Sequence, residues 1–433
     1  MKERCEMKTR CKVEGLKLLL VCLLMWPVGA ETGAFAHGSD DGASLQAFCD
    51  EAIVYCARQV QRALKGLQLE DGGYDYTLMP RNIASDGKTW TTRKASAEEW
   101  CSGFWPGILW MTYEATGDSL VRRAAEGYTQ SLSFLDSRPA FDHDLGFLVI
   151  NSFLKGLGAQ NDGGPSEYRR IALAAADTLA TLYNNKVGTI LSWPRHVRDY
   201  GGHNTIMDNM MNLELLFWAA NEAKGNQAKS KALYDIAVHH AETTMAHHFR
   251  RDGSCYHVAV YDALDGHFIR GVTHQGHHDE SMWARGQAWA IYGYTMVYRF
   301  THDKKFLTHA CKAADIYLRR LADTSDDLIP RWDMDDPYPR ASKDASAACV
   351  VASALLELSS YVGGEKGKNY QKTAVSSLRQ LSTDRYQSRD RNVAFLMHST
   401  GHHPAGSEID YSIVYADYYY LEALLRLRQM QIK

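Results

Sequence analysis

Residues 283–303 read WARGQAWAIYGYTMVYRFTHD, a helical stretch that begins with polar and glycine residues and is then apolar nearly all round. Five other stretches share this pattern of a polar or glycine-containing start and a run without a polar face. A helix that is apolar on every side needs burial on every side. The sequence therefore predicts inner helices over 101–118, 143–158, 208–226, 283–303, 344–364 and 416–427.

Helices with a narrower apolar stripe are predicted between these six. In residues 45–64, apolar side chains recur at the i, i+3, i+4 and i+7 spacing of a helix that buries one face. The strict alternation of the two kinds predicts an all-α fold, an (α/α)6 barrel whose inner helices line a cavity. An open helical solenoid is the alternative, but the unequal spacing of the inner-helix starts favours the closed barrel. The other outer helices are expected over 119–136, 166–184, 229–249, 304–321 and 369–383.

Strand signals are sparse. The clearest lies in residues 254–272, where two short alternating runs flank a polar turn at 262–266 and predict a β-hairpin. This hairpin leads into the stretch GVTHQGHHDESMWARGQAW (271–289), which places His, acidic and Trp residues directly before the fourth inner helix.

The N-terminal residues have the pattern of a cleavable signal peptide. Lys and Arg residues precede an apolar run from Leu18 to Ala30, and Ala34-Phe35-Ala36 suits a signal peptidase. The run is too short to cross a bilayer of about 30 Å as a helix. We expect residues 1–36 to be removed and residues 37–433 to form the barrel domain of a periplasmic or secreted protein, with no membrane anchor after cleavage.

The composition excludes some functional classes. The net charge is −3 and no basic tract is present, which argues against a nucleic-acid partner. The nine Cys residues contain no Cys-x-x-Cys pair, so buried small hydrophobic residues are expected rather than disulfides or metal ligands. The oligomeric state is left open by the sequence.

Two acidic residues stand at the starts of consecutive inner helices, Asp144 and Asp208. Inner helices of such a barrel run in one direction, so their N-termini gather at one rim, where free N–H groups and helix dipoles favour negative charge. Either Asp alone is explained by helix N-capping. Two carboxylates that share one cavity suggest catalysis instead, because repulsion and burial would keep a proton on one and leave the other charged.

The remaining acidic and histidine residues near the rim are interpreted more simply. The acids are expected to cap or bridge helices, and no His-Glu-x-x-His motif or tight Cys/His set supports a metal or another cofactor. His239, His240, His247 and His248 are expected on the solvated face of an outer helix. The acids in question are Asp279, Glu280, Asp344, Asp417, Glu408 and Asp410.

Several motifs together resemble glycoside hydrolase family 88, the unsaturated glucuronyl hydrolases. They keep one order over nearly the whole chain: WCSGFWPG (100–107), HDLGF (143–147), MDNMMNL (207–213), HQG (274–276), WARGQAW (283–289) and SEIDYSIVYADYYYLEAL (407–424). The resemblance implies an (α/α)6 barrel of the six-hairpin glycosidase type. It also implies an enzyme that releases the 4,5-unsaturated uronic acid left by polysaccharide lyases at the non-reducing end of oligosaccharides, by hydrating the double bond.

The resemblance also implies residue roles. Asp208 corresponds to the general acid/base that protonates carbon 4 of the sugar and assists the addition of water at carbon 5. Asp144 corresponds to the second carboxylate, whose charge would hold the proton on Asp208. Arg285 is the candidate to bind the substrate carboxylate, and Trp100 and Trp289 are candidates to stack on the sugar. The other substrate-binding candidates are His143, His257, His274 and Gln275.

One departure from the family pattern concerns specificity. Some members that prefer sulfated glycosaminoglycan fragments carry a Ser-x-x-Ser-x-Lys loop before the last inner helix, whereas residues 397–410 read MHSTGHHPAGSEID, without the Lys. We expect a glycosaminoglycan-derived substrate. The alternatives are an unsaturated rhamnogalacturonyl hydrolase acting on pectin fragments, a sugar epimerase and a non-catalytic glycan-binding barrel.

Overall fold

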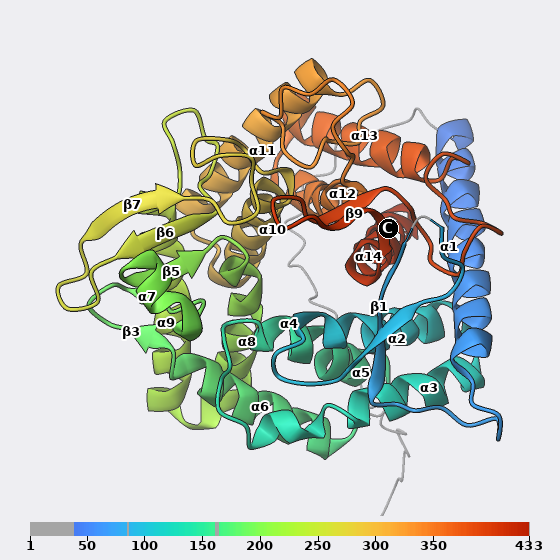
Figure 1. Cartoon of the computed structure of the whole chain (residues 1–433), viewed down its shortest axis with the longest axis horizontal. Coiled ribbons are helices and arrows are strands. Elements are labelled where there is room, and N and C mark those ends of the chain that lie inside the picture. The colour runs from blue at the N-terminus through green and yellow to red at the C-terminus, as the bar shows by residue number, and fades with distance from the viewer. Residues whose placement is uncertain (1–38, 85, 161–163, 433) are drawn as a thin grey trace, which may run out of the picture.

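The inner helices form a closed ring in the computed structural model, which describes residues 39–84, 86–160 and 164–432 (Figure 1). Each inner helix packs on the next, and α14 returns to α2, so the barrel is closed and the open solenoid is excluded. The ring contains α2 (Phe104–Thr116), α4 (Leu145–Val149) continued by a π turn (Ile150–Leu154) and α5 (Lys155–Gly158), α8 (Asn209–Glu222), α10 (Ala284–Thr301), α12 (Ala345–Tyr361) and α14 (Val414–Ile432).

The outer helices alternate with the inner ones, as predicted. In α12 every residue from Ala345 to Leu358 is buried, whereas α1 buries one stripe that includes Cys49, Cys56 and Val60. All-round and one-sided burial therefore follow the two sequence patterns. The outer helices are α1 (Ser39–Leu67), α3 (Ser119–Gln130), α6 (Ser166–Ala180), α9 (Gln227–His247), α11 (Lys304–Thr324) and α13 (Gly364–Leu381).

Two glycines allow close approach between neighbouring inner helices. A Cβ on Gly103 would lie 2.3 Å from the carbonyl oxygen of Phe147, and a Cβ on Gly146 would lie 2.5 Å from the Cα of Asn212. Both distances are shorter than any tolerable contact with backbone atoms. Gly146 therefore sets the spacing between the start of α4 and the first turn of α8.

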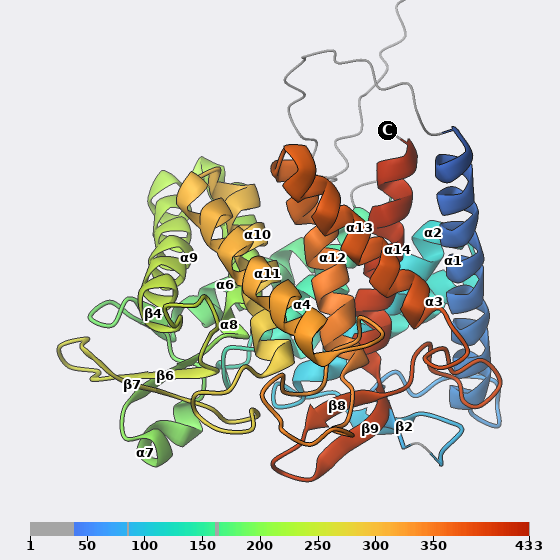
Figure 2. The same ribbon diagram turned by 90° about the horizontal axis from the view of Figure 1, so that it is seen from above.

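The sheets lie at the end of the barrel where the inner helices begin (Figure 2). The hairpin of β6 (Val258–Tyr261) and β7 (Phe268–Val272) confirms the prediction over 254–272, and β5 (His203–Ile206) adds a third strand. A four-stranded antiparallel sheet in the order β2-β1-β9-β8 was not predicted. Its strands are β1 (Leu78–Ile83), β2 (Thr91–Lys94), β8 (Ser399–His402) and β9 (Ser407–Ile413); a separate short pair contains β3 (Tyr183–Asn184) and β4 (Thr189–Ile190).

A cluster of ion pairs occupies the interior toward the C-terminal ends of the inner helices. Arg299 pairs with Glu214 at 2.9 Å and with Glu357 at 2.8 Å, linking α10 to α8 and α12. Glu422 of α14 accepts a hydrogen bond from Tyr292 at 3.1 Å. Lys155 and Arg426 also lie within 4 Å of Glu422, at 3.3 and 3.6 Å. These pairs join five segments of the inner ring.

The acidic residues that were expected to cap or bridge helices are hydrogen-bonded or ion-paired. Asp344 accepts the backbone N–H of Ser346 at the start of α12, and Asp417 accepts the backbone N–H groups of Phe395 and Leu396. The remaining pairs are Asp279 with the Thr273 N–H, Glu280 with His278, Glu408 with Arg81, and Asp410 with His398.

The prediction of a solvated histidine face on α9 is wrong for two residues. His240 and His248 are fully buried, and His240 Nδ1 accepts the backbone N–H of Ile190 at 3.0 Å. The His240 side chain therefore packs α9 onto β4, a contact that helical spacing alone does not reveal.

The described cysteines are free thiols. Cys49, Cys56, Cys101, Cys255 and Cys349 are buried and Cys311 is half-buried, which confirms that they act as small core residues. Within the described ranges, no helix combines the length and apolarity needed to cross a membrane. The predicted signal peptide lies outside the described residues.

Candidate active site

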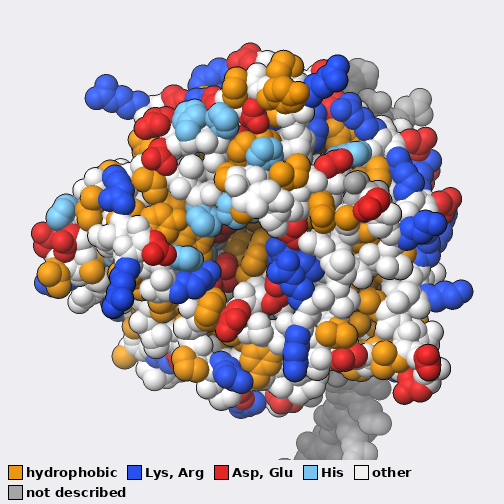
Figure 3. Space-filling model, in the orientation of Figure 1, with side chains coloured by type: hydrophobic (Ala, Val, Ile, Leu, Met, Phe, Trp, Pro, Cys, Tyr) orange, Lys and Arg blue, Asp and Glu red, His pale blue; other side chains and the backbone are white. Residues whose placement is uncertain are grey.

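A cavity of about 360 Å³ opens at the end of the barrel where the inner helices begin. Figure 3 looks onto this end and shows a central hollow where basic, acidic and histidine side chains meet hydrophobic ones. Of the predicted site residues, Trp100, Asp144, Asp208, His274, Gln275 and Arg285 line it. Unpredicted lining residues include Arg81, Arg93, Asp142, Trp193, Arg195, His196, His402 and Tyr415.

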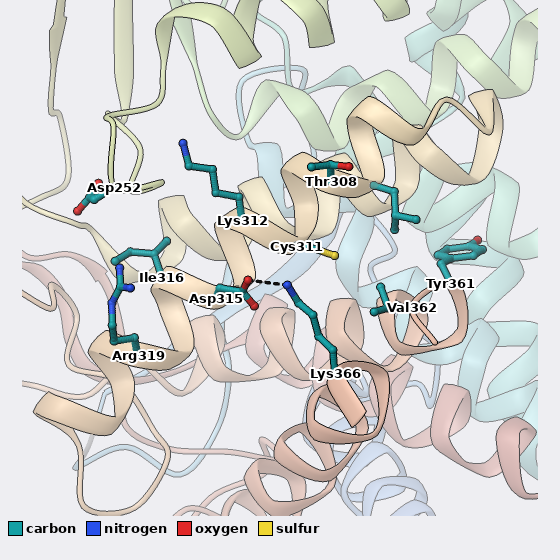
Figure 4. Close-up of a pocket in the computed structure, with 11 residues that line it drawn as sticks. Asp252, Thr308, Cys311, Lys312, Asp315, Ile316, Arg319, Tyr361, Val362 and Lys366 are labelled. Atoms are coloured by element: carbon teal, nitrogen blue, oxygen red, sulfur yellow. Dashed lines mark hydrogen bonds and ion pairs between the residues drawn. The ribbon is translucent and has the colours of Figure 1, made fainter. Parts of the chain in front are cut away.

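A larger depression of about 720 Å³ lies on the outside of the barrel (Figure 4). It runs between α11 and α13, and its centre holds an ion pair between Asp315 and Lys366 at 2.6 Å. None of the predicted site residues lines it. The chemistry-bearing residues therefore gather inside the barrel.

Asp144 and Asp208 occupy N-cap positions without capping. Neither side chain accepts a hydrogen bond from its own helix, whereas Asp344 at the equivalent position of α12 does. Both carboxylates are turned into the cavity instead. The capping interpretation is therefore excluded for both residues, and their side chains are available for chemistry.

Asp208 is held beside a histidine whose tautomer is fixed. His257 Nδ1 lies 3.3 and 3.2 Å from the backbone N–H groups of His274 and Gln275, so it accepts and the proton resides on Nε2. His257 Nε2 lies 3.4 Å from Asp208 Oδ2. Burial acts to raise the pKa of Asp208, but the His257 contact and the Arg285 guanidinium act against it, and this pKa is lowered below its ordinary value. Asp208 is therefore a carboxylate.

Asp144 has the opposite surroundings. His143 Nδ1 donates to the Ser192 carbonyl at 3.0 Å, and its Nε2 lies 3.3 Å from Asp144 Oδ1. Burial lowers the pKa of His143, so the ring is neutral and presents a lone pair to Asp144. Burial, Asp142 and Asp208 together raise the pKa of Asp144 well above its ordinary value. Asp144 therefore holds a proton.

This distribution confirms the expected split between the carboxylates but reverses its direction. We predicted that Asp208 would carry the proton and Asp144 the charge. The structure reverses this because the neighbours differ: a histidine N–H faces Asp208, whereas a third carboxylate, Asp142, lies beside Asp144. The two pKa values are thus displaced in opposite directions, as an acid and a base in one site require.

The profile of Glycosyl Hydrolase Family 88 matches residues 79–427. The chain belongs to this family. An unsaturated glucuronyl hydrolase from Formosa agariphila is 41% identical over 345 residues, which cover 78% of this chain and 82% of the relative. An unsaturated chondroitin disaccharide hydrolase from Streptococcus pyogenes is 34% identical over 340 residues, 76% of this chain and 81% of the relative.

A solved structure of an unsaturated glucuronyl hydrolase specific for heparin superimposes with a TM-score of 0.79. Its sequence is 39% identical, and the match covers 90% of this chain and 99% of the other. The predicted family and barrel fold are confirmed, and this family 88 chain is a glycoside hydrolase.

Arg285 is less available than predicted. Its side chain is 2% exposed, and Nη1 pairs with Asp344 Oδ2 at 2.7 Å while Nη1 and Nη2 donate to the carbonyls of Thr400 and Gly401 at 2.5 Å. These bonds occupy Nη1 and one N–H of Nη2, so a substrate carboxylate would be bound by Nε and the second N–H of Nη2, and this role stays a prediction. In this family 88 chain, Arg285 therefore braces α10 against α12 and β8, and its charge acts on Asp208 from the cavity wall.

The two predicted stacking tryptophans are placed differently. Trp100 is half-buried and lines the cavity, 5.0 Å from the Tyr415 ring. Trp289 has no exposed surface and packs on Phe147 and Tyr419, so its predicted stacking on substrate is wrong. Trp193 lines the cavity as well.

The HQG motif delivers its side chains to the cavity as expected. His274 Nδ1 lies 3.1 Å from the Tyr200 hydroxyl, and Gln275 Nε2 donates to the Gly401 carbonyl at 3.0 Å. The His402 ring, from the loop without the Lys, lies 4.8 Å from the His274 ring. Burial lowers the pKa of His274 to about 3, so this histidine is neutral at physiological pH.

Asp142, His143 and Asp144 lie close enough to suggest a metal site, because one donor atom from each falls within 4.8 Å of the others. Both oxygens of Asp142 already accept hydrogen bonds, from the Asp144 backbone N–H and from Arg195. Asp142 is therefore already engaged in hydrogen bonding, and metal-free chemistry stays our prediction.

Proposed function

We propose that this enzyme removes a 4,5-unsaturated uronic acid from the non-reducing end of lyase-generated oligosaccharides by hydrating the double bond. The observation that carries the proposal is the pair of uncapped cavity carboxylates, one protonated and one charged. Addition of water to a polarised alkene needs one acid and one base in the same site.

The carboxyl pair both supplies and recovers the proton that the reaction needs. A proton passes from the carboxyl pair to carbon 4, and a water oxygen bonds to carbon 5. A carboxylate of the pair accepts one proton from that water, and the other stays on the new hydroxyl group. The pair regains its single proton, and the sugar gains one water. The resulting hemiketal opens and releases the remaining saccharide. Asp208, fixed by His257, faces the water in this scheme, and Asp144 holds the proton of the free enzyme.

The test follows loss of the ultraviolet absorbance of the double bond. Unsaturated disaccharides from chondroitin, hyaluronan, heparin and pectin lyase digests are supplied to the wild type, to Asp208→Asn and to Asp265→Asn, a matched change in the exposed β6–β7 turn. We expect absorbance loss with the wild type and the Asp265 variant only. Persistent absorbance with every sugar from folded wild-type protein would refute the proposal.

Glycosaminoglycan fragments are the proposed substrate class. Relatives named for heparin and for chondroitin disaccharides support it. The segment 397–410 offers His402, at the end of β8, to the cavity and contains no lysine, so we expect unsulfated disaccharides to react at least as fast as sulfated ones. Comparing kcat/KM for matched sulfated and unsulfated pairs tests this preference, and faster turnover of pectin fragments would favour the rhamnogalacturonyl alternative.

We also propose export to the periplasm or beyond the cell. The basic and apolar leader over residues 1–36 supports it. Mass spectrometry of the chain recovered from the producing bacterium should give an N-terminus near residue 37 in the periplasmic or extracellular fraction. An intact leader on cytoplasmic protein would contradict the proposal.

A further inference from the structure

A third carboxylate, Asp142, connects the catalytic pair to the cavity wall. It lies two residues before Asp144 and is 5% exposed. Its Oδ1 accepts the backbone N–H of Asp144 at 3.0 Å, and its Oδ2 accepts Nη1 of Arg195 at 2.9 Å. One buried side chain thus fixes the backbone of Asp144 and binds a cation from another segment.

Arg195 approaches from the turn at Pro194–His196, between β4 and α7 (Val197–Tyr200). Its guanidinium lies over the Phe141 ring at 4.6 Å, and its side chain is 41% exposed and lines the cavity. Two of the four cavity-lining arginines, Arg81 and Arg285, are buried and engaged on several sides. Arg195 is held by one carboxylate and remains accessible.

The surroundings of Asp144 come from several elements. Burial and the charges of Asp142 and Asp208 raise its pKa, whereas Arg195 lowers it. Asp142 and Arg195 therefore change the pKa of Asp144 in opposite directions, although they are hydrogen-bonded to each other. The titratable, charged and polar groups that face Asp144 are Asp142 and His143 on its own loop, Arg195 from the turn before α7, Asp208 and Asn212 from α8, and Cys101 from the turn before α2.

We propose that Asp142 and Arg195 are positioning residues that set the proton occupancy of the catalytic pair. Asp142 keeps the proton on Asp144, and Arg195 limits this effect by neutralising Asp142. The inference rests on the proposed hydration reaction, in which the pair must carry one proton. Neither residue needs to touch the reacting carbons.

The signs of the two perturbations follow from this arrangement. A group with a raised pKa is protonated below that pKa and loses its proton as pH rises through it, so Asp144 governs the high-pH limb of activity. Asp142→Asn keeps an oxygen acceptor for the Asp144 N–H but removes the charge, which moves this limb to lower pH by roughly one pH unit. Arg195→Gln moves it to higher pH by a smaller amount, because Arg195 is partly exposed.

The experiment measures kcat/KM against pH for the full-length wild type, Asp142→Asn, Arg195→Gln and Arg195→Lys. Arg198→Gln, an exposed arginine three residues further along, is the matched control. We expect Asp142→Asn and Arg195→Gln to displace the high-pH limb of kcat/KM in opposite directions. The control should keep the wild-type pH profile. In Arg195→Lys the limb should lie closer to its wild-type position than in Arg195→Gln. Displacement in the same direction, or unmoved limbs with reduced kcat, would show a merely structural role and overturn the inference.

A second readout is independent of turnover. Infrared titration of the protonated carboxyl band, assigned to Asp144 by its loss in Asp144→Asn, reports proton occupancy directly. In each variant, the midpoint of this infrared titration should move in the same direction as the high-pH limb of kcat/KM. If no unsaturated sugar is hydrated, the proposed function fails, whereas the infrared titration still decides the inference about Asp142 and Arg195.

Discussion

Replacing Gly146 by alanine should separate the two catalytic helices. The new Cβ would lie 2.4 Å from Oδ1, 2.5 Å from Cα and 2.7 Å from Cβ of Asn212. Because one of these atoms is backbone, α4 or α8 must shift by about 1 Å to relieve contacts of this kind, and the hydrogen bond from the Phe147 N–H to Asn212 Oδ1, now 2.8 Å, is stretched. Overpacking of this kind costs about 1–3 kcal/mol of stability.

The effect on activity should exceed the effect on stability. The displaced segment carries Asp144 and its partner carries Asp208, and a misplacement of about 1 Å in a catalytic constellation costs on the order of 100-fold in rate. We expect kcat/KM for an unsaturated disaccharide to fall by about that factor, while urea denaturation still shows one cooperative transition.

Gly158→Ala is the matched control for this change. Gly158 ends the same inner segment, and a Cβ there would meet no atom within 4 Å. It should retain wild-type kcat/KM. Wild-type activity in Gly146→Ala would refute the reasoning, because it would mean that the spacing between α4 and α8 does not set the geometry of the pair.

Three further perturbations test other parts of the structure. His257→Leu removes the contact that helps lower the pKa of Asp208. Because Asp208 is charged above its pKa and loses that charge as pH falls, the low-pH limb of kcat/KM should move to higher pH by about one unit. An unmoved low-pH limb would contradict the role of His257. Asp344→Ala leaves Arg285 buried without its carboxylate and should lower the free energy of unfolding by about 3–5 kcal/mol in urea titration. The pKa of Glu422 is lowered to about 2, so its stabilising charge is present above pH 4.5 and is lost as pH falls toward 2; Glu422→Gln should flatten the dependence of Tm on pH in that window.

The helical architecture was predictable because each helix carries its own burial pattern. A run such as residues 345–358, with no polar face, can only be an inner helix, and the stripe through Cys49 and Cys56 can only be an outer one. The sheet joining β1 to β9 was not predictable in the same way. Its strands are separated by more than 300 residues, and Pro80 within β1 argues locally against a strand.

The site was predictable in its position but not in its details. Asp144 and Asp208 stand at helix starts, which the sequence marks. A helix that is apolar all round does not reveal which side faces the cavity, so neither the full burial of Trp289 nor the hydrogen bonds of Arg285 could be predicted. The protonation of the pair depends on Asp142 and His257, whose proximity to the carboxylates is set by tertiary packing.

The ion-pair cluster between Arg299, Glu357 and Glu422 has a consequence for the order of events in turnover. It lies in the interior toward the opposite end from the sheets, whereas the cavity opens at the sheet end, so under the proposed function substrate would enter and both products would leave at the sheet end. A substrate cleaved at its terminal sugar would place that sugar innermost, with the rest of the oligosaccharide nearer the entrance. After cleavage the shortened saccharide must therefore depart before the keto-sugar can escape, and added shortened saccharide should trap the keto-sugar in the enzyme.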